Sequence, residues 1–238
     1  HIQADFDANG HNLGINLFET ALKNKQFMRL PIYYGCIYNN LGQLFETAFY
    51  QNKHNSAAYL KLAISNYQTA QKNLNRNYPY DFGLISYHLA LLYYDYWKYT
   101  ADLQALRDAV SKLRDAEKVY SLAQFPSSWC TIEELLGNYL TALGMQTKSN
   151  ELMHLAIEAY KNQQKIFTQN ETPEIWAAIQ EKIGNVFYLL GKQNNDDQLM
   201  EEARNYYDSA LEIYSDLALK LEIKNVNRAL LKIRNYLG

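Results

Sequence analysis

Four prolines set the organisation of this chain, because they recur at nearly constant intervals. Pro31, Pro79, Pro126 and Pro173 are the only prolines among the 238 residues, and they are separated by 48, 47 and 47 residues. Self-similarity at a fixed period of this length indicates a repeat architecture, in which each unit packs on its neighbours. We therefore expect an array of four units with one continuous core.

Five further positions of the unit repeat in phase with the proline. An aromatic residue stands three positions after it, a small residue or cysteine four after, isoleucine six after, leucine or isoleucine ten after, and a small residue eleven after. In that order the columns are Tyr34, Phe82, Trp129 and Trp176; Gly35, Gly83, Cys130 and Ala177; Ile37, Ile85, Ile132 and Ile179; Leu41, Leu89, Leu136 and Ile183; and Gly42, Ala90, Gly137 and Gly184. Agreement of whole columns in four copies distinguishes a repeat from a chance spacing.

The spacing of the apolar columns predicts that the first half of each unit is a helix. They lie on one face of a structure with 3.6 residues per turn, whereas a strand would place every second residue on one face. Proline suits the first turn of a helix, because its missing N–H needs no intrahelical partner there. We expect Thr172 to be an N-cap, and Gly144 and Gly191 to end their helices.

A second set of columns predicts a second helix in each unit. Ala63, Ala109, Ala156 and Ala203 recur at intervals of 46, 47 and 47 residues. The residues four, seven and eleven positions later are, in that order, Tyr67, Leu113, Tyr160 and Tyr207; Ala70, Ala116, Gln163 and Ala210; and Leu74, Tyr120, Phe167 and Tyr214. These offsets mark one helical face, so each unit is predicted to be an antiparallel helix pair. Small residues would allow close helix approach, and aromatic residues would fill the space between.

Together these columns resemble the tetratricopeptide repeat, in the long-helix form found in bacteria. The resemblance covers about residues 31–216, and it is carried best by Pro173, Trp176, Ile183, Gly184, Ala203, Ala210 and Leu211. The usual unit has about 34 residues, so a period of 47 indicates longer helices. Three-helix armadillo or HEAT units have a similar period, but the glycine and alanine columns disfavour them. The resemblance implies an all-α, right-handed solenoid of antiparallel helix pairs.

We expect residues 1–238 to form one repeat domain. Gly14, Phe18 and Ala21 match the phase of the second helix, so residues 1–30 are predicted to hold an orphan second helix of a preceding repeat, and the natural protein to extend upstream. The predicted repeats are 31–78, 79–125, 126–172 and 173–216, followed by a capping helix in 217–238. The apolar residues expected to cap the array are Leu221, Ile223, Val226, Leu230, Leu231 and Ile233.

Composition and motifs argue against several classes of function. The net charge is −2 and the basic residues are scattered, which argues against a nucleic-acid partner. No run approaches the ~18 apolar residues of a membrane span. The five histidines have no metal-ligand spacing, and there is no glycine-rich phosphate loop or nucleophile elbow, so we expect no metal, no cofactor and no enzyme activity. Cys36 and Cys130 are expected to pack as small apolar residues without forming a disulfide.

The resemblance implies a binding surface on the first helices, which line the concave face in proteins of this kind. By position, its residues here are Asn39, Gln43, Glu46, Tyr87, Leu91, Tyr94, Glu134, Asn138, Thr141, Glu181, Asn185 and Tyr188. The carboxylate clamp of some members needs lysine followed four residues later by asparagine. Asn138 and Asn185 match its second position, but Glu134 and Glu181 occupy the first. A basic or polar-aromatic ligand is therefore favoured, unless these glutamates are simply solvated.

The best-supported function is a scaffold that binds a protein or peptide of unknown identity on this surface. The Asn138 and Asn185 side chains are expected to lie on the surface and to contact the partner. Replacing both with alanine should therefore weaken partner binding and leave folding nearly intact, because surface substitutions usually change stability little. Alternatives are a regulatory or sensor module of a larger multidomain protein, or a self-association module. A receptor for a small ligand would need a cavity, which periodicity does not reveal. His88 is expected to be a polar helix-surface residue or to face the same surface.

Overall fold

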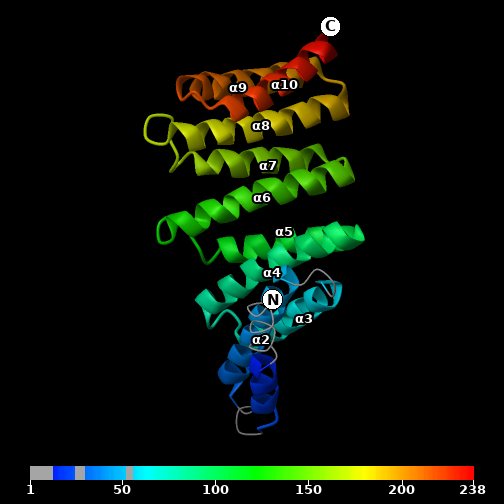
Figure 1. Ribbon diagram of the computed structural model, residues 1–238, viewed down its shortest axis with the longest axis vertical. Coiled ribbons are helices and arrows are strands. Elements are labelled where there is room, and N and C mark those ends of the chain that lie inside the picture. Colours follow the sequence, from blue (N-terminus) through cyan, green and yellow to red (C-terminus); the bar gives the residue numbers. More distant parts are fainter. Residues whose placement is uncertain (1–12, 25–29, 52–55) are drawn as a thin grey trace, which may run out of the picture. The chain divides into compact units, whose positions relative to one another are not determined.

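The computed structural model describes residues 13–24, 30–51 and 56–238, and within these ranges it is all-helical with no strand (Figure 1). Residues 13–22 form a helix. The helices that follow are α2 (Pro31–Gln51), α3 (Ser56–Asn73), α4 (Pro79–Thr100), α5 (Leu103–Glu117), α6 (Pro126–Thr147), α7 (Asn150–Gln163), α8 (Pro173–Asn194), α9 (Asp197–Asp216) and α10 (Lys220–Leu237). The predicted all-α class, with two helices in each period, is confirmed.

The chain divides into two compact units, residues 1–121 and 122–238. Neighbouring helices pack in succession within each. In the first unit α2 packs on α3, α3 on α4, and α4 on α5; in the second, α6 packs on α7, α7 on α8, α8 on α9, and α9 on α10. The units are described separately below.

The helices begin where the sequence predicts, but by two different means. Proline occupies the first turn of α4, α6 and α8, and no side chain caps these helices. Thr172 has the N-cap position of α8, yet its hydroxyl donates to the carbonyl of Thr168. The helices that follow start at side-chain caps: Asp102, Ser149 and Asp196 each accept a backbone N–H from the first turn of α5, α7 and α9. The proline therefore marks only the first helix of each pair.

The prediction that Gly144 and Gly191 end their helices is wrong. Helices α6 and α8 continue for three more residues and end at Lys148 and Asn195, which adopt the left-handed conformation with φ of 54° and 52°. The carbonyls of both glycines accept a hydrogen bond from these caps. A Cβ on Gly144 would lie 2.8 Å from Cγ of Met153, so this glycine permits close packing against the next helix.

The glycine column confirms the predicted antiparallel pairing. A Cβ on Gly137 would lie 2.5 Å from the ring of Tyr160, while Gly144, later in α6, meets Met153, earlier in α7. The two helices therefore run in opposite directions with almost no space between them. The same crossed order relates α2 and α3 in the first unit, where Gly35 meets Leu74 and Gly42 meets Tyr67.

The apolar columns form the cores of both units. In the first unit the helix of residues 13–22 contributes Ile15, Phe18 and Leu22 to a core built mainly from α2, α3 and α4. This confirms a helix in the predicted orphan segment, whose residues 1–12 and 25–29 lie outside the described ranges. Its derivation from a preceding repeat stays a prediction.

Two of the expected core residues in α10 are exposed. Val226 and Ile233 are fully buried, and Ile223 and Leu230 pack beside them, but Leu221 and Leu231 are 65% and 53% exposed. Counted from Lys220, Leu231 occupies the position eleven residues on, where α2, α4, α6 and α8 carry glycine or alanine. In α2, α6 and α8 this position meets a tyrosine of the helix that follows, whereas in α10 it is exposed. The positions three, six and ten residues on, Ile223, Val226 and Leu230, pack in the core as the columns predict.

The two cysteines differ in their surroundings. Both are free thiols; Cys130 is buried, as its place in the small-residue column predicts, whereas Cys36 is exposed. The packing role predicted for Cys36 is therefore wrong. It lies one position beyond Gly35, which occupies the small-residue column, and a shift of one residue rotates a helical side chain by about 100°.

Candidate functional site

In the first unit, side-chain contacts hold the first helices α2 and α4 beside one another. The hydroxyl of Tyr50 on α2 donates to Oδ2 of Asp95 on α4 across 2.9 Å. The rings of Phe49 and Tyr99 meet edge to face with centroids 6.0 Å apart. The predicted binding residues of these two helices consequently belong to one surface.

Glu46 is not accessible to a partner on that surface, because it is buried in a cluster with Tyr67 and His88. Tyr67 donates its hydroxyl to Oε2 of Glu46 at 2.6 Å, and Nδ1 of His88 lies 3.0 Å from the same oxygen. The rings of Tyr67 and His88 stack at 5.4 Å. Burial, and then the neighbouring Glu46 carboxylate, raise the pKa of Tyr67. His88 is thus a link between α4 and α2, which neither sequence-based interpretation anticipated.

The other predicted residues of the first unit are more accessible. Gln43 is exposed, and Tyr87, Leu91 and Tyr94 form a half-buried row along α4. Two neighbours on α4 flank Tyr94: the ring of Trp97 at 5.2 Å and Nζ of Lys98, also 5.2 Å from the ring centroid.

Asn39 is the least available residue of this set. It is half-buried, and its Oδ1 is enclosed with no hydrogen-bond partner among the described residues. An enclosed oxygen cannot serve a peptide lying on the surface. The accessible part of the predicted site on this unit is therefore Gln43 with the α4 row.

In the second unit an ion pair joins the first helices α6 and α8. Nζ of Lys182 on α8 lies 2.5 Å from Oε1 of Glu134 on α6, and the two side chains are 34% and 46% exposed. The ammonium also lies 5.9 Å from the ring centroid of Tyr160. The charge of Glu134 is therefore compensated within the chain. A basic ligand was expected because of Glu134 and Glu181, and the argument no longer holds for Glu134.

Asn138 and Asn185 each receive a hydrogen bond from the tyrosine column of the second helices. The hydroxyl of Tyr160 donates to Oδ1 of Asn138 at 2.7 Å, and that of Tyr207 donates to Oδ1 of Asn185 at 3.2 Å. Burial, and then the Glu181 carboxylate, raise the pKa of Tyr207. The asparagines thus tie first helices to second helices. Replacing either asparagine with alanine would remove this hydrogen bond between the paired helices, and the expectation that folding stays nearly intact remains a prediction.

The remaining predicted residues of the second unit are Thr141, Glu181 and Tyr188. The Thr141 hydroxyl donates to the carbonyl of Gly137 in its own helix at 2.7 Å. Oε2 of Glu181 accepts a hydrogen bond from Tyr214 at 3.1 Å. Tyr188 is half-buried at the edge of the core. Each of these residues is only partly exposed.

A pocket that the sequence did not predict lies between α3, α4 and α5. Its volume is about 410 Å³. The residues that line it are Gln68, Gln71 and Lys72 of α3, Phe82 and Tyr93 of α4, and Lys112 of α5. No aspartate or glutamate is among them. The pocket lies on the side of the second helices α3 and α5, and it includes none of the predicted binding residues.

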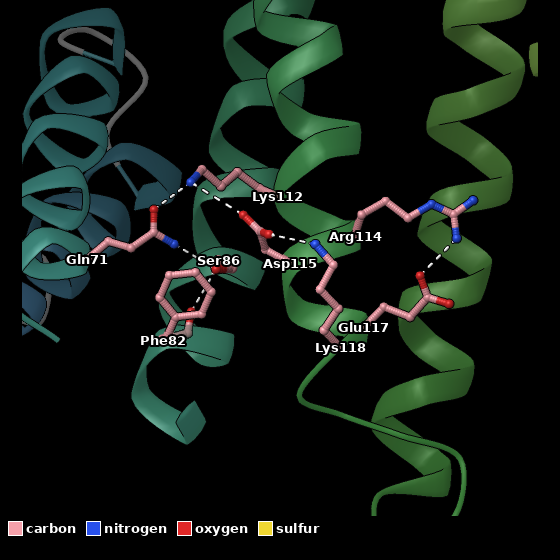
Figure 2. A network of polar contacts seen from close by, with 8 residues as sticks. All are labelled: Gln71, Phe82, Ser86, Lys112, Arg114, Asp115, Glu117 and Lys118. Atoms are coloured by element: carbon pink, nitrogen blue, oxygen red, sulfur yellow. Dashed lines mark hydrogen bonds and ion pairs between the residues drawn. The ribbon is translucent and has the colours of Figure 1, made fainter. Parts of the chain in front are cut away.

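A chain of hydrogen bonds orients one wall of this pocket (Figure 2). The Ser86 hydroxyl donates to the Phe82 carbonyl at 2.7 Å and accepts from Nε2 of Gln71 at 2.7 Å. The amide oxygen of Gln71 therefore faces Nζ of Lys112, 2.5 Å away. On α5, Asp115 lies 3.8 Å from this ammonium and 3.2 Å from that of Lys118.

Tyr93 forms another part of the lining. Its hydroxyl oxygen accepts a hydrogen bond from Nε2 of Gln68 at 2.6 Å. Burial is the largest cause that raises the pKa of Tyr93. The hydrogen bond from Gln68 lowers this pKa, and the Asp108 carboxylate raises it. Phe82 occupies the aromatic column of the first helices, which the sequence assigns to the core. Only the packing of three helices reveals that it also lines a pocket.

Comparisons with known proteins place no limit on function. No protein-family profile matches the chain, and no curated protein matches it significantly. Within the described ranges, no group of three or more histidine, cysteine, aspartate or glutamate residues is arranged to hold a metal ion. None of the described helices combines the length and the apolar character that a membrane crossing requires.

Proposed function

We propose that this chain is a tetratricopeptide-like solenoid that binds a peptide or protein partner on the surfaces of its first helices. The observation that carries the proposal is the Glu134–Lys182 pair, which joins α6 to α8 although its members stand 48 residues apart. Such a bond supports a surface assembled from successive repeats. Asn138 and Asn185 then lie on adjoining helices, as a preformed peptide site requires.

The partner that fits this surface is a polar segment with aromatic or aliphatic anchors. Tyr87, Leu91 and Tyr94 offer apolar area to such anchors in the first unit, and Tyr188 offers it in the second. Aromatic residues supply much of the binding energy at protein interfaces. Because Glu134 is already paired, binding is expected to change little with salt concentration.

Peptide selection tests this proposal. Peptides selected from a random library displayed on phage are expected to bind the parent chain and to bind Leu91→Ala or Tyr188→Ala at least about tenfold more weakly, since one lost anchor contributes ~1.4 kcal/mol or more. Fluorescence anisotropy measures the affinities. Circular dichroism checks that each variant keeps its helix content.

Leu62→Ala is the matched control for this experiment. Leu62 is 43% exposed on α3, a second helix, so its truncation should leave peptide affinity unchanged. Selected peptides that lose affinity for Leu62→Ala, and not for the first-helix variants, would place binding on the opposite side of the helix pairs. A library that yields no binder at all would also contradict the proposal.

A second candidate function is self-association through α9 and α10, favoured by their opposite charges. The exposed basic residues of α10 are Lys220, Lys224, Arg228, Lys232 and Arg234. The exposed acidic residues of α9 are Asp197, Glu202, Asp208, Glu212 and Asp216. A two-fold dimer sets α9 of each copy against α10 of the other, so both contacts are complementary. Leu221 and Leu231, exposed among the basic residues, add apolar area.

Charge reversal tests this dimer. The parent chain is expected to sediment as a dimer at about 0.05 M salt and to dissociate at about 0.5 M, where surface charges are screened. Lys224→Glu/Arg228→Glu and, separately, Asp208→Lys/Glu212→Lys should each be monomeric. An equimolar mixture of these two variants should form a heterodimer, because both of its contacts are again complementary. A parent chain that is monomeric at low salt, or a mixture that stays monomeric, excludes this arrangement.

A further inference from the structure

The pocket between α3, α4 and α5 has a lining rich in hydrogen-bond donors. The amide of Gln71 is held by Ser86, so its oxygen and not its nitrogen faces Lys112. The Lys112 ammonium is thereby kept at the pocket wall, with its side chain 24% exposed. An ammonium has three hydrogens. The contact with Gln71 uses one, and the Asp115 carboxylate at 3.8 Å is too distant for a second strong hydrogen bond.

Tyr93 supplies a neutral donor to the same space. Its oxygen is the acceptor for Gln68, so its own hydroxyl hydrogen points elsewhere. Tyrosine is neutral at pH 7, since its ordinary pKa is about 10, so this hydrogen is present. A phenol that is already accepting one hydrogen bond is a better donor toward a second group, because hydrogen-bonded chains polarise one another.

The charge of the lining is positive. Lys72 and Lys112 both line the pocket, and its lining includes no carboxylate. Asp115 lies between Lys112 and Lys118 on α5, so its charge is shared between two ammonium groups. Two carboxylates lie near the lining but outside it: Asp115, 3.8 Å from Nζ of Lys112, and Asp108, whose charge contributes to the raised pKa of Tyr93.

The size and the apolar part of the lining indicate more than a bare ion. A volume of about 410 Å³ lies within the range of about 300–1,000 Å³ that is usual for small-molecule sites. Phe82 provides an apolar wall on the α4 side. The fitting ligand therefore combines an acidic group with a small apolar body.

We propose that this pocket is a binding site for a small organic carboxylate, whose acidic group is held by Lys72, Lys112 and the Tyr93 hydroxyl while its apolar body contacts Phe82. The site is independent of the first-helix surfaces, since it shares no residue with them. The ligand is a small free acid, because the pocket has a volume of small-molecule size and is lined by three helices of one unit.

Phenylacetate is the probe, with phenylacetamide as its neutral counterpart of nearly equal shape. In a titration of the full chain followed by ¹H–¹⁵N NMR, phenylacetate should produce saturable shifts of amides in α3, α4 and α5, with a Kd in the millimolar range expected for about ten heavy atoms. Phenylacetamide should bind at least about tenfold more weakly, because it does not gain from the two ammonium groups.

Variants separate this site from general attraction to lysine. Lys72→Gln and Lys112→Gln should each weaken phenylacetate binding at least about fivefold, Lys112→Arg should retain most of it, and Tyr93→Phe should weaken it by a smaller factor. Lys61→Gln, at an exposed position of α3 outside the pocket, is the matched control and should bind like the parent. Absence of saturable shifts, equal binding of phenylacetamide, or equal loss in Lys61→Gln would overturn the proposal. None of these outcomes affects peptide binding on the first-helix surfaces.

Discussion

Gly137→Leu is expected to unfold the second unit at a much lower urea concentration than the parent. A Cβ at this position would lie 2.5–2.7 Å from three atoms of the Tyr160 ring. That ring cannot easily move, because it is buried and its hydroxyl is bonded to Asn138. Overpacking typically costs about 1–3 kcal/mol, and a whole leucine between two touching helices is expected to reach or exceed the upper value. Urea melts followed by circular dichroism measure the loss.

Gln146→Leu is the control for this change, because it adds a leucine at an exposed position of the same helix. It should alter stability by less than about 0.5 kcal/mol. Gly184→Ala should be milder than Gly137→Leu, since a Cβ there meets the Ala203 carbonyl at 3.2 Å. Similar urea midpoints for Gly137→Leu and Gln146→Leu would show that α6 and α7 do not approach as closely as described.

Raising the pH above about 10 is expected to unfold the protein, because several buried tyrosines resist ionisation in the folded state. Burial is the largest cause that raises the pKa of Tyr67, Tyr207 and Tyr214, with the Glu46 carboxylate next for Tyr67 and that of Glu181 for the other two. The hydrogen bond between the Tyr34 and Tyr38 hydroxyls is the largest cause that raises the pKa of Tyr38 to about 12.

The sign of the pH effect follows from these directions. In the unfolded chain tyrosine ionises near pH 10, while the folded state retains the neutral phenols to higher pH. The stabilisation is fully present below about pH 10 and is lost as the pH rises toward the folded-state pKa values. Absorbance of tyrosinate near 295 nm should therefore rise in one cooperative step together with loss of helix.

Tyr207→Phe isolates one contribution to this alkaline transition. Without the Tyr207 hydroxyl, the free energy of unfolding should fall less steeply with pH above pH 10, because one fewer proton is released on unfolding. Tyr33→Phe, at a site that is 53% exposed, is the matched control for the loss of one phenol hydroxyl. If all tyrosines titrated near pH 10 with the helices intact, the buried hydrogen bonds of Tyr67 and Tyr207 would be refuted.

Local patterns predicted the helices well. Proline at the start of a helix and apolar spacing along one face are local properties, so they place α4, α6 and α8 within a residue or two. The glycine columns were correctly linked to close helix approach. Gly144 and Gly191 were misread as stops, because glycine favours helix ends and tight helix contacts alike. Only the position of Met153 distinguishes these two roles for Gly144.

The candidate site was predicted less well, because whether a side chain is accessible to a partner depends on its contacts with residues distant in the sequence. Gln43 and the α4 row remain accessible, but Glu46 is enclosed by Tyr67 and His88. The pocket lined by Lys72 and Lys112 joins residues 40 positions apart that show no shared pattern. No property of either lysine alone indicates that the other is near.

The sequence by itself determined the all-helical class, the period, the pairing of helices and most residues of the core. These follow from periodicity, because burial of one helical face requires apolar residues at helical spacing whatever lies opposite. Tertiary structure alone decided which polar side chains are paired with another residue of the chain and which are solvated. A carboxylate such as Glu134 has the same local sequence whether it is solvated or paired, and it is the approach of Lys182 from the next first helix that settles its state.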